Sequence, residues 1–426
     1  MSTDTRDPLE GQLFVALVGE RFDAHDFLHK AIDGGAAGLL VERGRAGEAP
    51  EGVAVIEVDD TLFALGELAR AHRRRLGTPV VALTGSNGKT TTKELLAGIL
   101  SRSNATLKTQ GNLNNLIGVP MTVLGIEASH AVAVVEMGMN QPGEIARYTE
   151  ICEPAVGMVI NVGPAHIGEL GSIEAIAAAK GELYAGLSAG AVRVVSADDE
   201  RVVKVAGPGG RTFGRAADAD VRLVSTDAVG VERQRVELSI DGRALTVEIP
   251  FPGAHNAMNA TAAVAAATAA PVTVSDDDIV EGLAAVAPVA RRLVPRQIGP
   301  YLVIDDCYNA NGASMVAALE TVAARGARFG ALLGEMRELG AHSVAEHRRV
   351  GEAAVRLGAA FVVTFGPEAK AIADGAAGTS THHEDDDLDA AFAALTARLE
   401  DGDVLLVKGS RGIRMERFID RLEAQA

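Results

Sequence analysis

Short apolar runs alternate with helix-like stretches in the first part of the chain. The apolar runs cover Leu13–Val18, Gly38–Val41 and Val53–Val58, and a helix-like stretch, Thr61–Leu76, follows them. Gly77-Thr78-Pro79 then breaks the pattern, as expected of a linker. We therefore expect a small α/β N-terminal domain over residues 1–78.

From Val80 the pattern changes to strand, glycine-rich turn and helix. The runs VVALTG (80–85), AVAVVEMG (131–138) and AVGMVINVG (155–163) have the form of buried strands. The segment TTTKELLAGIL (90–100) has the periodicity of a helix. Strands that alternate with helices imply a largely parallel sheet covered on both faces. The sequence thus predicts a central parallel-sheet domain.

Residues 210–250 depart from this pattern. RVELSIDGRALTVEI (235–249) alternates polar and apolar residues around Asp241-Gly242, which indicates a hairpin and a small antiparallel element. The alanine-rich stretch Asn256–Ala270 is expected to be helical and to end before Pro271. Pro288 to Pro300 is rich in proline, so we place a domain boundary near Val289. The central domain is then expected to span residues 79–289.

Four further apolar runs follow this boundary. They are YLVIDDC (301–307), FGALLG (329–334), AFVVTFG (360–366) and DVLLVKG (403–409), separated by helix-like segments. This arrangement predicts a second α/β unit, Rossmann-like, over residues 290–426. The predicted fold class is therefore α/β with three domains.

Two charged segments each allow two interpretations. Arg73-Arg74-Arg75 is either a solvated helix end or a contact for phosphate. THHEDDDLD (381–389) is expected to be a charged loop, and its His382-His383 pair either binds metal or is simply solvated.

Composition restricts the classes of function. The net charge of -17 disfavours non-specific binding to nucleic acid or to an anionic membrane. Two cysteines, Cys152 and Cys307, form no disulfide framework, which fits a reducing compartment. The N-terminus lacks the apolar run of a signal peptide, and no stretch of about 18 apolar residues is present. We expect a cytoplasmic protein without membrane insertion.

The segment from Thr84 to Thr90, TGSNGKT, lies between a predicted strand and a predicted helix. Glycines allow backbone N–H groups to turn toward an anion, and the helix N-terminus favours negative charge. In a phosphate loop Lys89 would reach the terminal phosphates and the Thr90 hydroxyl would bind Mg²⁺. The general pattern is incomplete, because Leu83 occupies its first glycine position. An ordinary glycine-rich turn is the alternative, and a phosphate loop alone does not separate hydrolases, kinases and ligases.

Three more residues carry candidate chemistry after predicted strands. Glu136 follows the run AVAVV, at the end of a strand where α/β proteins bind ligands, and would hold Mg²⁺ directly or through water. His166 follows another apolar run, and Lys180 lies in a helix beyond it. Each of the three taken alone is also compatible with a purely structural role.

Nine motifs together resemble, in order, those of the Mur ligases. They are TGSNGKTT (84–91), TQGNLNNLIGVP (109–120), EMGMNQPGEI (136–145), NVGPAHIGELGS (161–172), AKGELY (179–184), PGAHNAMNATAA (252–263), DDCYNANGASM (305–315), LLGEMRELG (332–340) and VKGSRG (407–412). The resemblance covers nearly the whole chain. NLNNLIGVP and DDCYNAN are typical of the branch that adds D-alanyl-D-alanine to a UDP-N-acetylmuramoyl tripeptide in peptidoglycan synthesis.

The resemblance implies a reaction and its cofactors, ATP and Mg²⁺. Family enzymes phosphorylate a substrate carboxylate with ATP, and an amine then attacks the acyl phosphate to give an amide, ADP and phosphate. Lys89 would hold the phosphates, Thr90 and Glu136 would bind one Mg²⁺, and His166 would help to hold a second. Lys180 would be a carbamylated metal ligand or, unmodified, a phosphate contact.

The resemblance also assigns roles to the remaining candidate residues. The phosphate-loop residues Gly85, Ser86, Asn87, Gly88, Lys89, Thr90 and Thr91 would bind nucleotide, as would His255, Asn256, Asn259, Arg292 and Asp306. The residues expected to contact the substrates are Ser2, Thr3, Arg6, Asn112, Asn114, Asn115, Tyr308, Asn309, Asn311, Lys408, Ser410 and Arg411. Helix capping is the alternative role for Asn256.

Departures from the family pattern fall in two places. Arg291 stands where the family usually has glycine, and Val18 stands where a basic residue is common. The N-terminal domain, which would bind the uridine nucleotide through Ser2, Thr3 and Arg6, is expected to be shortened, lacking the family's first strand and helix. We expect a monomer.

Two alternative functions remain open. One is a related amide ligase that acts on a different carboxylate and amine, in a specialised-metabolite or cofactor pathway. The other is a nucleotide-binding scaffold without ligation. Release of phosphate that requires both an acid and an amine would distinguish a ligase from a scaffold.

Overall fold

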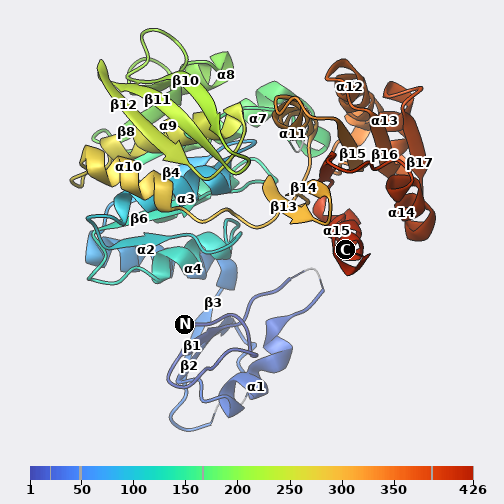
Figure 1. Cartoon of the computed structure of the whole chain (residues 1–426). Helices are drawn as coiled ribbons and strands as arrows, with labels where there is room; N and C mark the ends of the chain where they lie inside the picture. Colours follow the sequence, from blue (N-terminus) through green and yellow to red (C-terminus); the bar gives the residue numbers. More distant parts are fainter. Residues whose placement is uncertain (20, 48–49, 166, 385–386, 426) are drawn as a thin grey trace.

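Three sheets follow one another along the chain in the computed structural model (Figure 1). It describes residues 1–19, 21–47, 50–165, 167–384 and 387–425. The protein is mixed α/β, as the sequence predicts. No helix within these ranges is long and apolar enough to cross a membrane.

The N-terminal unit contains a three-stranded parallel sheet in the order β1-β2-β3. Its elements are β1 (Leu13–Val15), the 3-10 helix η1 (Ala24–Phe27), α1 (Leu28–Asp33), β2 (Gly38–Glu42), β3 (Ala54–Val58) and α2 (Thr61–Leu76). Each strand falls within or overlaps one of the predicted apolar runs. The Asp60 side chain caps α2 by accepting a hydrogen bond from the Phe63 N–H.

The central unit is built on a nine-stranded sheet in the order β12-β11-β10-β9-β8-β7-β4-β6-β5. Its strands are β4 (Val80–Thr84), β5 (Thr106–Lys108), β6 (Val132–Glu136), β7 (Val156–Val159), β8 (Val192–Ser196), β9 (Arg211–Gly214), β10 (Val221–Val229), β11 (Arg233–Ile240) and β12 (Arg243–Ile249). Its helices are α3 (Lys89–Leu100), α4 (Gly118–Leu124), α5 (Glu144–Cys152), α6 (Ile167–Leu170), α7 (Ile173–Ala185), α8 (Glu200–Ala206), α9 (Ala254–Ala269) and α10 (Asp276–Ala285).

Both faces of the parallel part of this sheet are covered by helices. Neighbouring residues of β4 point to opposite faces, so Val81 packs with α3, α9 and α10 while Val80 packs with α4, α5 and α7. Helix α9 is almost entirely buried, and its alanines allow close approach to α3 and the sheet. This two-sided burial explains why the strands read as continuous apolar runs.

The predicted hairpin at Asp241-Gly242 is confirmed. Strands β11 and β12 pair antiparallel around these two residues, whose φ angles of 51° and 83° are the left-handed values of a type I′ turn. The antiparallel strands are not a separate element, because β10, β11 and β12 continue the parallel sheet at one edge.

The C-terminal unit has a six-stranded sheet in the order β13-β14-β18-β15-β16-β17. Its strands are β13 (Val294–Ile298), β14 (Tyr301–Asp306), β15 (Phe329–Gly334), β16 (Phe361–Phe365), β17 (Ser380–His383) and β18 (Val404–Lys408). Its helices are α11 (Gly312–Ala323), η2 (Gly340–His342), α12 (Ser343–Arg356), η3 (Pro367–Ala369), α13 (Lys370–Gly375), α14 (Leu388–Thr396), η4 (Arg411–Ile413) and α15 (Glu416–Gln425).

Two edge strands of this sheet correct the sequence prediction. The segment predicted as a charged loop from Thr381 begins inside β17, and His382 contacts the Thr364 hydroxyl of β16. Strand β13 contains Pro295 and pairs antiparallel with β14. Proline and charged residues are typical of edge strands, and they conceal a strand from a search for apolar runs.

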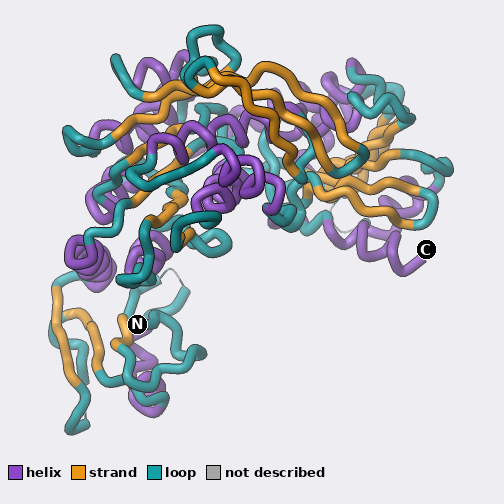
Figure 2. The backbone as a smooth tube through the Cα atoms, turned by 60° about the vertical axis from the view of Figure 1, so that its left-hand side comes forward, coloured by secondary structure: helices purple, strands orange, loops and turns teal. Residues whose placement is uncertain are grey.

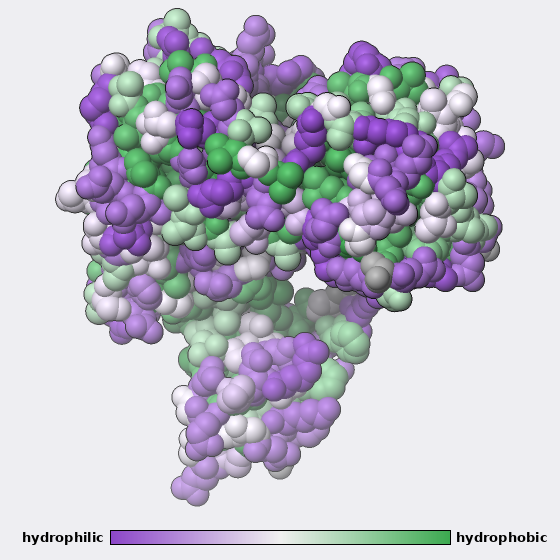
Figure 3. Space-filling view, viewed as in Figure 1, coloured by the Kyte–Doolittle hydropathy of each residue, from purple (hydrophilic) through white to green (hydrophobic). Residues whose placement is uncertain are grey.

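Helix α2 joins the N-terminal unit to the central one. Its Leu65 packs with Val15 and Leu40 of the N-terminal sheet, and its Ala69 belongs to the core of the central unit. In Figures 1 and 2 the N-terminal sheet projects from this junction, away from the C-terminal unit. The space-filling view shows it as a separate lobe with open space beside it (Figure 3).

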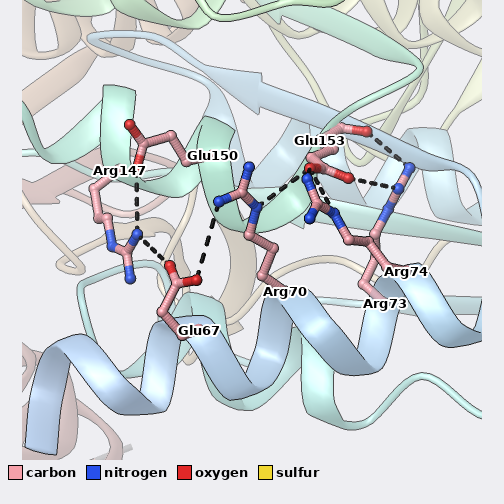
Figure 4. A network of polar contacts seen from close by, with 7 residues as sticks. All are labelled: Glu67, Arg70, Arg73, Arg74, Arg147, Glu150 and Glu153. Atoms are coloured by element: carbon pink, nitrogen blue, oxygen red, sulfur yellow. Dashed lines mark hydrogen bonds and ion pairs between the residues drawn. The ribbon is translucent and has the colours of Figure 1, made fainter.

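The basic end of α2 pairs with a carboxylate of the central unit. Arg70, Arg73 and Arg74 project toward Glu153, and all three form hydrogen bonds with it (Figure 4). Arg147 of α5 completes the network by pairing with Glu67 of α2. The Arg73-Arg74-Arg75 run therefore contributes to a junction between units through its first two members.

Candidate functional site

The glycine-rich turn lies between β4 and α3, as predicted. Gly88 adopts a φ of 79° and precedes the first residue of α3. A Cβ atom at this position would lie 2.3 Å from Asn259 Oδ1, so both the backbone angle and the close packing require glycine. The Lys89 ammonium donates a hydrogen bond to the Gly85 carbonyl at 2.8 Å. The turn thus has the N–H-rich helix start and the cation that phosphate binding needs.

A second loop, Asn161–Gly163, holds the turn in place. The Asn161 side chain accepts a hydrogen bond from the Asn87 N–H at 2.9 Å and donates one to the Asn87 carbonyl at 3.1 Å. The Ser86 hydroxyl donates to the Gly163 carbonyl and accepts from the Gly163 N–H. The sequence analysis singled out this loop because of His166. It missed Asn161, whose role depends on a contact with a distant segment.

Glu136 is buried at the end of β6, beside the start of α3. Its Oε1 atom accepts hydrogen bonds from the Thr90 hydroxyl at 3.2 Å and from the Asn114 amide at 2.8 Å. Its Oε2 atom is buried and accepts no hydrogen bond in the described part of the chain. A hydroxyl, a carboxylate and an unused carboxylate oxygen are hard oxygen donors that suit Mg²⁺. Among the described residues, no group of three or more His, Cys, Asp or Glu side chains could hold a metal.

Lys180 is buried in α7. No hydrogen bond or ion pair reaches its ammonium from the described residues, and burial lowers the pKa of Lys180 well below its usual value, with a further contribution from Lys89. A lowered pKa increases the fraction of neutral amine, the form that carbamylation requires. His166, predicted as a second metal ligand, lies outside the described residues.

Two hydrogen bonds connect the central and C-terminal units across the site. Arg292 donates to the Thr90 hydroxyl at 3.0 Å, and the Asn311 amide donates to Asn87 Oδ1 at 2.7 Å. The Arg292 guanidinium also lies over the Tyr308 ring, 4.1 Å from its centroid. Arg291, at the position where the family usually has glycine, has a left-handed φ of 60°. A glycine would adopt that angle without the steric cost that arginine carries.

The C-terminal part of the site contains a buried ion pair. Lys408 Nζ lies 2.6 Å from Asp306 Oδ2 and donates a hydrogen bond to the Asn309 carbonyl. Burial, together with the charge of Lys408, lowers the pKa of His255 to about 4. His255 is therefore neutral at neutral pH and can both donate and accept a hydrogen bond.

Asn256 and Asn259 are buried on α9 and bond to one another. Asn259 donates to Asn256 Oδ1 at 3.1 Å, and Asn256 donates to the Pro252 carbonyl at 2.7 Å. The residue preceding α9 is Gly253, and Asn256 caps no N–H group at the start of this helix. Its capping role, the alternative considered for it, is therefore wrong.

Most of the predicted site residues line one cavity of about 590 Å³ between the central and C-terminal units. They are Ser86, Asn87, Gly88, Lys89, Thr90, Thr91, Asn112, Asn114, Asn115, Glu136, His255, Asn256, Asn259, Arg292, Asp306, Tyr308, Asn309, Asn311 and Lys408. A second cavity of about 330 Å³ shares Ser86, Lys89, Asn309 and Asn311 with it and adds Ser410 and Arg411. The two cavities therefore meet at the phosphate-loop lysine.

Several residues fall outside this arrangement, and others were missed. Gly85 and Lys180 line neither cavity. Ser2, Thr3 and Arg6 belong to a turn of the N-terminal unit, where Arg6 pairs with Asp4.

The second cavity also contains Arg337, which belongs to the motif LLGEMRELG but had no role assigned from the sequence. Its backbone N–H donates to the Ser410 hydroxyl, a contact that only the fold reveals.

Comparison with known proteins gives full-length matches. Residues 83–267 match the Mur ligase middle domain, and residues 291–411 match the Mur ligase glutamate ligase domain. The chain is 39% identical to the UDP-N-acetylmuramoyl-tripeptide–D-alanyl-D-alanine ligase of Escherichia coli strain K12, over 99% of this chain and 93% of that protein. It is 36% identical to the ligase of the same name from Bacillus subtilis strain 168, over 99% and 92% of the two chains.

Solved structures give the same result. Crystal structure I of MurF from Acinetobacter baumannii matches with a TM-score of 0.92 and 36% identity, over 99% of this chain and 93% of that one. MurF ligase from Thermotoga maritima in complex with ADP matches with a TM-score of 0.89 and 29% identity, over 100% and 98% of the two chains.

Proposed function

The chain belongs to the Mur ligase family, and from this premise we propose that it adds D-alanyl-D-alanine to UDP-N-acetylmuramoyl tripeptide in peptidoglycan synthesis. It is an ATP-dependent, ADP-forming ligase. The observation that supports the reaction best is the cavity shared by two units, because it brings a phosphate loop, a buried acid and the C-terminal residues together. Similarity over 99% of the chain to ligases of this name supports the choice of substrates.

In this proposal the central unit binds the phosphates of ATP. The backbone N–H groups of Ser86–Lys89 surround the phosphates, and Lys89 exchanges its bond to the Gly85 carbonyl for one to a phosphate oxygen. Mg²⁺ held by Thr90 and Glu136 would neutralise charge that develops on the phosphates. Arg292 adds positive charge from the C-terminal side, while His255, Asn256, Asn259 and Asp306 bind the nucleoside.

The incoming amine would occupy the second cavity. D-alanyl-D-alanine carries a carboxylate, and Arg337 and Arg411 line that cavity with guanidinium groups suited to a carboxylate. Asn309 and Asn311 line both cavities, and Tyr308 lines the main one. Such a placement would direct the amine toward the acyl phosphate, and closure of the cleft would exclude the water that hydrolyses it.

The remaining assignments follow from the same premise. Residues 1–78 would form the domain for the uridine nucleotide, with Ser2, Thr3 and Arg6 at its diphosphate. Residues 79–289 would form the ATP-binding domain, and residues 290–426 the domain for the amine. We propose that the enzyme acts in the cytoplasm as a monomer, with Lys180 carbamylated or in contact with a phosphate.

Labelled oxygen tests the reaction. With ¹⁸O in the carboxylate of the tripeptide, one labelled oxygen should pass to the released phosphate. A carboxylate oxygen attacks the terminal phosphorus of ATP and ADP leaves; the amine then attacks the carbonyl carbon of the acyl phosphate, and phosphate leaves with that oxygen. Mass spectrometry of the phosphate measures the transfer. Unlabelled phosphate would exclude the acyl phosphate.

Substrate choice is tested in the same assay. Phosphate release should require both the muramoyl tripeptide and D-alanyl-D-alanine. Release with a different acid and amine, and none with this pair, would favour the related ligase of another pathway. Release with neither substrate present would indicate a nucleotide hydrolase.

A further inference from the structure

Lys93 is a fully buried lysine that no step of the proposed reaction uses. It lies on α3, one helical turn after Lys89, and its exposed fraction is 0%. Burying a charged group is costly unless hydrogen bonds and opposite charges compensate it. The contacts of its ammonium therefore indicate why a lysine is placed there.

Two of these contacts reach the asparagine-rich loop. Lys93 Nζ lies 2.8 Å from the Thr109 carbonyl oxygen and 3.4 Å from that of Gly111. The loop continues to Asn112, Asn114 and Asn115, which line the main cavity. The ammonium thus ties the start of this loop to the phosphate-loop helix.

Two other contacts reach carboxylates. Lys93 Nζ lies 3.0 Å from Glu94 Oε1 and 3.9 Å from Glu136 Oε2, the oxygen that accepts no hydrogen bond from the described residues. Glu94 also pairs with Lys108 on the outer side. A single ammonium therefore lies between the loop carbonyls and the acid of the candidate site.

The loop and the acid are also bonded to one another. The Glu136 N–H donates to the Thr109 hydroxyl at 3.0 Å, and the Asn114 amide donates to Glu136 Oε1 at 2.8 Å. The Gly138 N–H in turn donates to the Asn114 carbonyl. Lys93, Thr109 and Glu136 therefore form a closed ring of polar contacts, and Asn114 is joined to it through Glu136.

We propose that Lys93 is a positioning residue for ligation, which fixes the loop Thr109–Asn115 and the Glu136 carboxylate relative to the phosphate loop. This role rests on the proposed function. Lys93 lines neither cavity and touches no substrate. It acts through Asn112, Asn114 and Asn115, which line the main cavity, and through Glu136.

Two substitutions at this position separate its contributions. Lys93→Met keeps the approximate length of the side chain and removes both the charge and the hydrogen bonds. Lys93→Gln keeps a donor for the Thr109 carbonyl and removes the charge. Lys108→Met is the matched control, because Lys108 shares Glu94 as a partner but reaches neither the loop carbonyls nor Glu136.

The readouts are kcat and KM for each substrate, the Kd of ADP measured without Mg²⁺ by calorimetry, and the thermal midpoint. For Lys93→Met we expect kcat/KM for the muramoyl tripeptide to fall on the order of 10- to 100-fold, as displaced catalytic groups do. The Kd of ADP should stay within about threefold of the wild-type value, because the phosphate-loop backbone is held separately by Asn161 and Gly163. Lys93→Gln should recover part of the loss, and Lys108→Met should match the wild type.

The possible outcomes distinguish the proposals. Wild-type values of kcat/KM in folded Lys93→Met would overturn the positioning role, and so would an equal loss of ADP affinity and of turnover, which a general structural defect produces. If Lys93→Met does not fold, the Lys93→Gln protein decides by the same criteria. A wild-type enzyme without turnover of this substrate pair would instead overturn the proposed function, and this role with it.

Discussion

The two junctions of the protein are built from different interactions. At the first, three arginines of α2 converge on Glu153, and apolar residues of α2 pack into both adjoining units. At the second, two hydrogen bonds, Arg292 to Thr90 and Asn311 to Asn87, cross a cavity lined by the candidate site residues. We call the first junction the brace and the second the cleft, because the second contains the cavity lined by the candidate site residues.

The difference indicates where function and stability should separate. Substitutions of cleft side chains that cap no helix should change turnover with little effect on folding, because the polar groups there are available to ligands. Substitutions at the brace should change stability with little effect on turnover. The predictions below test this separation, from the largest expected effect to the smallest.

Lys89→Ala should cause the largest loss. Removing the cation at the transferring phosphoryl group is expected to lower ATP turnover by at least about 100-fold, as the loss of an electrostatic contact to a transition state does. The thermal midpoint should not fall, because within the described part of the chain the Lys89 ammonium bonds only to the Gly85 carbonyl. Phosphate release measures ATP turnover, and circular dichroism measures the thermal midpoint. Near-wild-type turnover by folded protein would remove the phosphate-loop assignment.

Arg292→Ala and Asn311→Ala should each lower kcat/KM by about 10-fold, the effect of losing one positioning contact. For Arg292→Ala the free energy of unfolding should change by less than about 0.5 kcal/mol, since its side chain makes one hydrogen bond across the cleft. Asn311→Ala should also lower the free energy of unfolding by about 1 kcal/mol, because the Asn311 side chain caps α11 through the Ser314 N–H. Arg325→Ala is the matched control. Arg325 also joins the two units, through the Val231 carbonyl, but lies outside both cavities. Equal losses of kcat/KM in all three variants would mean that contacts inside the cleft affect turnover no more than other contacts between the two units.

Glu153→Gln should lower the free energy of unfolding by about 1 kcal/mol and leave kcat unchanged, because exposed and half-exposed ion pairs contribute little each. Glu150→Gln is a control, since Glu150 makes one exposed contact with Arg147. Chemical denaturation measures the change. A fall in kcat that exceeds the loss of folded protein would show that the brace also positions the site.

The contribution of Glu153 should also depend on pH. Hydrogen bonding to Arg74, and further contacts with Arg70 and Arg73, lower the pKa of Glu153 from its ordinary value of 4.5. A depressed folded-state pKa stabilises the fold above pH 4.5, and the stabilisation is lost as the pH falls through the folded value. The difference between wild type and Glu153→Gln should therefore shrink as the solution is acidified. A constant difference across that range would contradict the ion-pair explanation.

Ligand-induced closure should have the smallest effect. An ATP analogue with Mg²⁺ and the carboxylate substrate should slightly reduce the radius of gyration, with the bend near residues 288–295, where Arg291 and Leu293 have left-handed φ angles. Small-angle scattering with and without ligands measures it. An unchanged radius, together with full activity of Arg292→Ala, would remove the shared-cleft explanation.

The sequence by itself determined features that depend on neighbouring residues. The turn at Gly85–Lys89, the hairpin at Asp241-Gly242 and the buried strands follow from local chemistry and periodicity, and the structure contains all of them. The residues that line the cavity could be predicted because their motifs follow a family pattern in order.

Only the tertiary structure decided which distant groups meet. Arg70, Arg73 and Arg74 pair with Glu153, and Lys93 reaches Glu136 and the Thr109 carbonyl, across segments far apart in sequence. The edge strands β13 and β17 could likewise be identified only from their pairing with β14 and β16. The residues around a charged side chain in the sequence do not determine whether it stays in solvent or forms a buried ion pair. Its partner is fixed only when packing of the sheets and helices brings the opposite charge within reach.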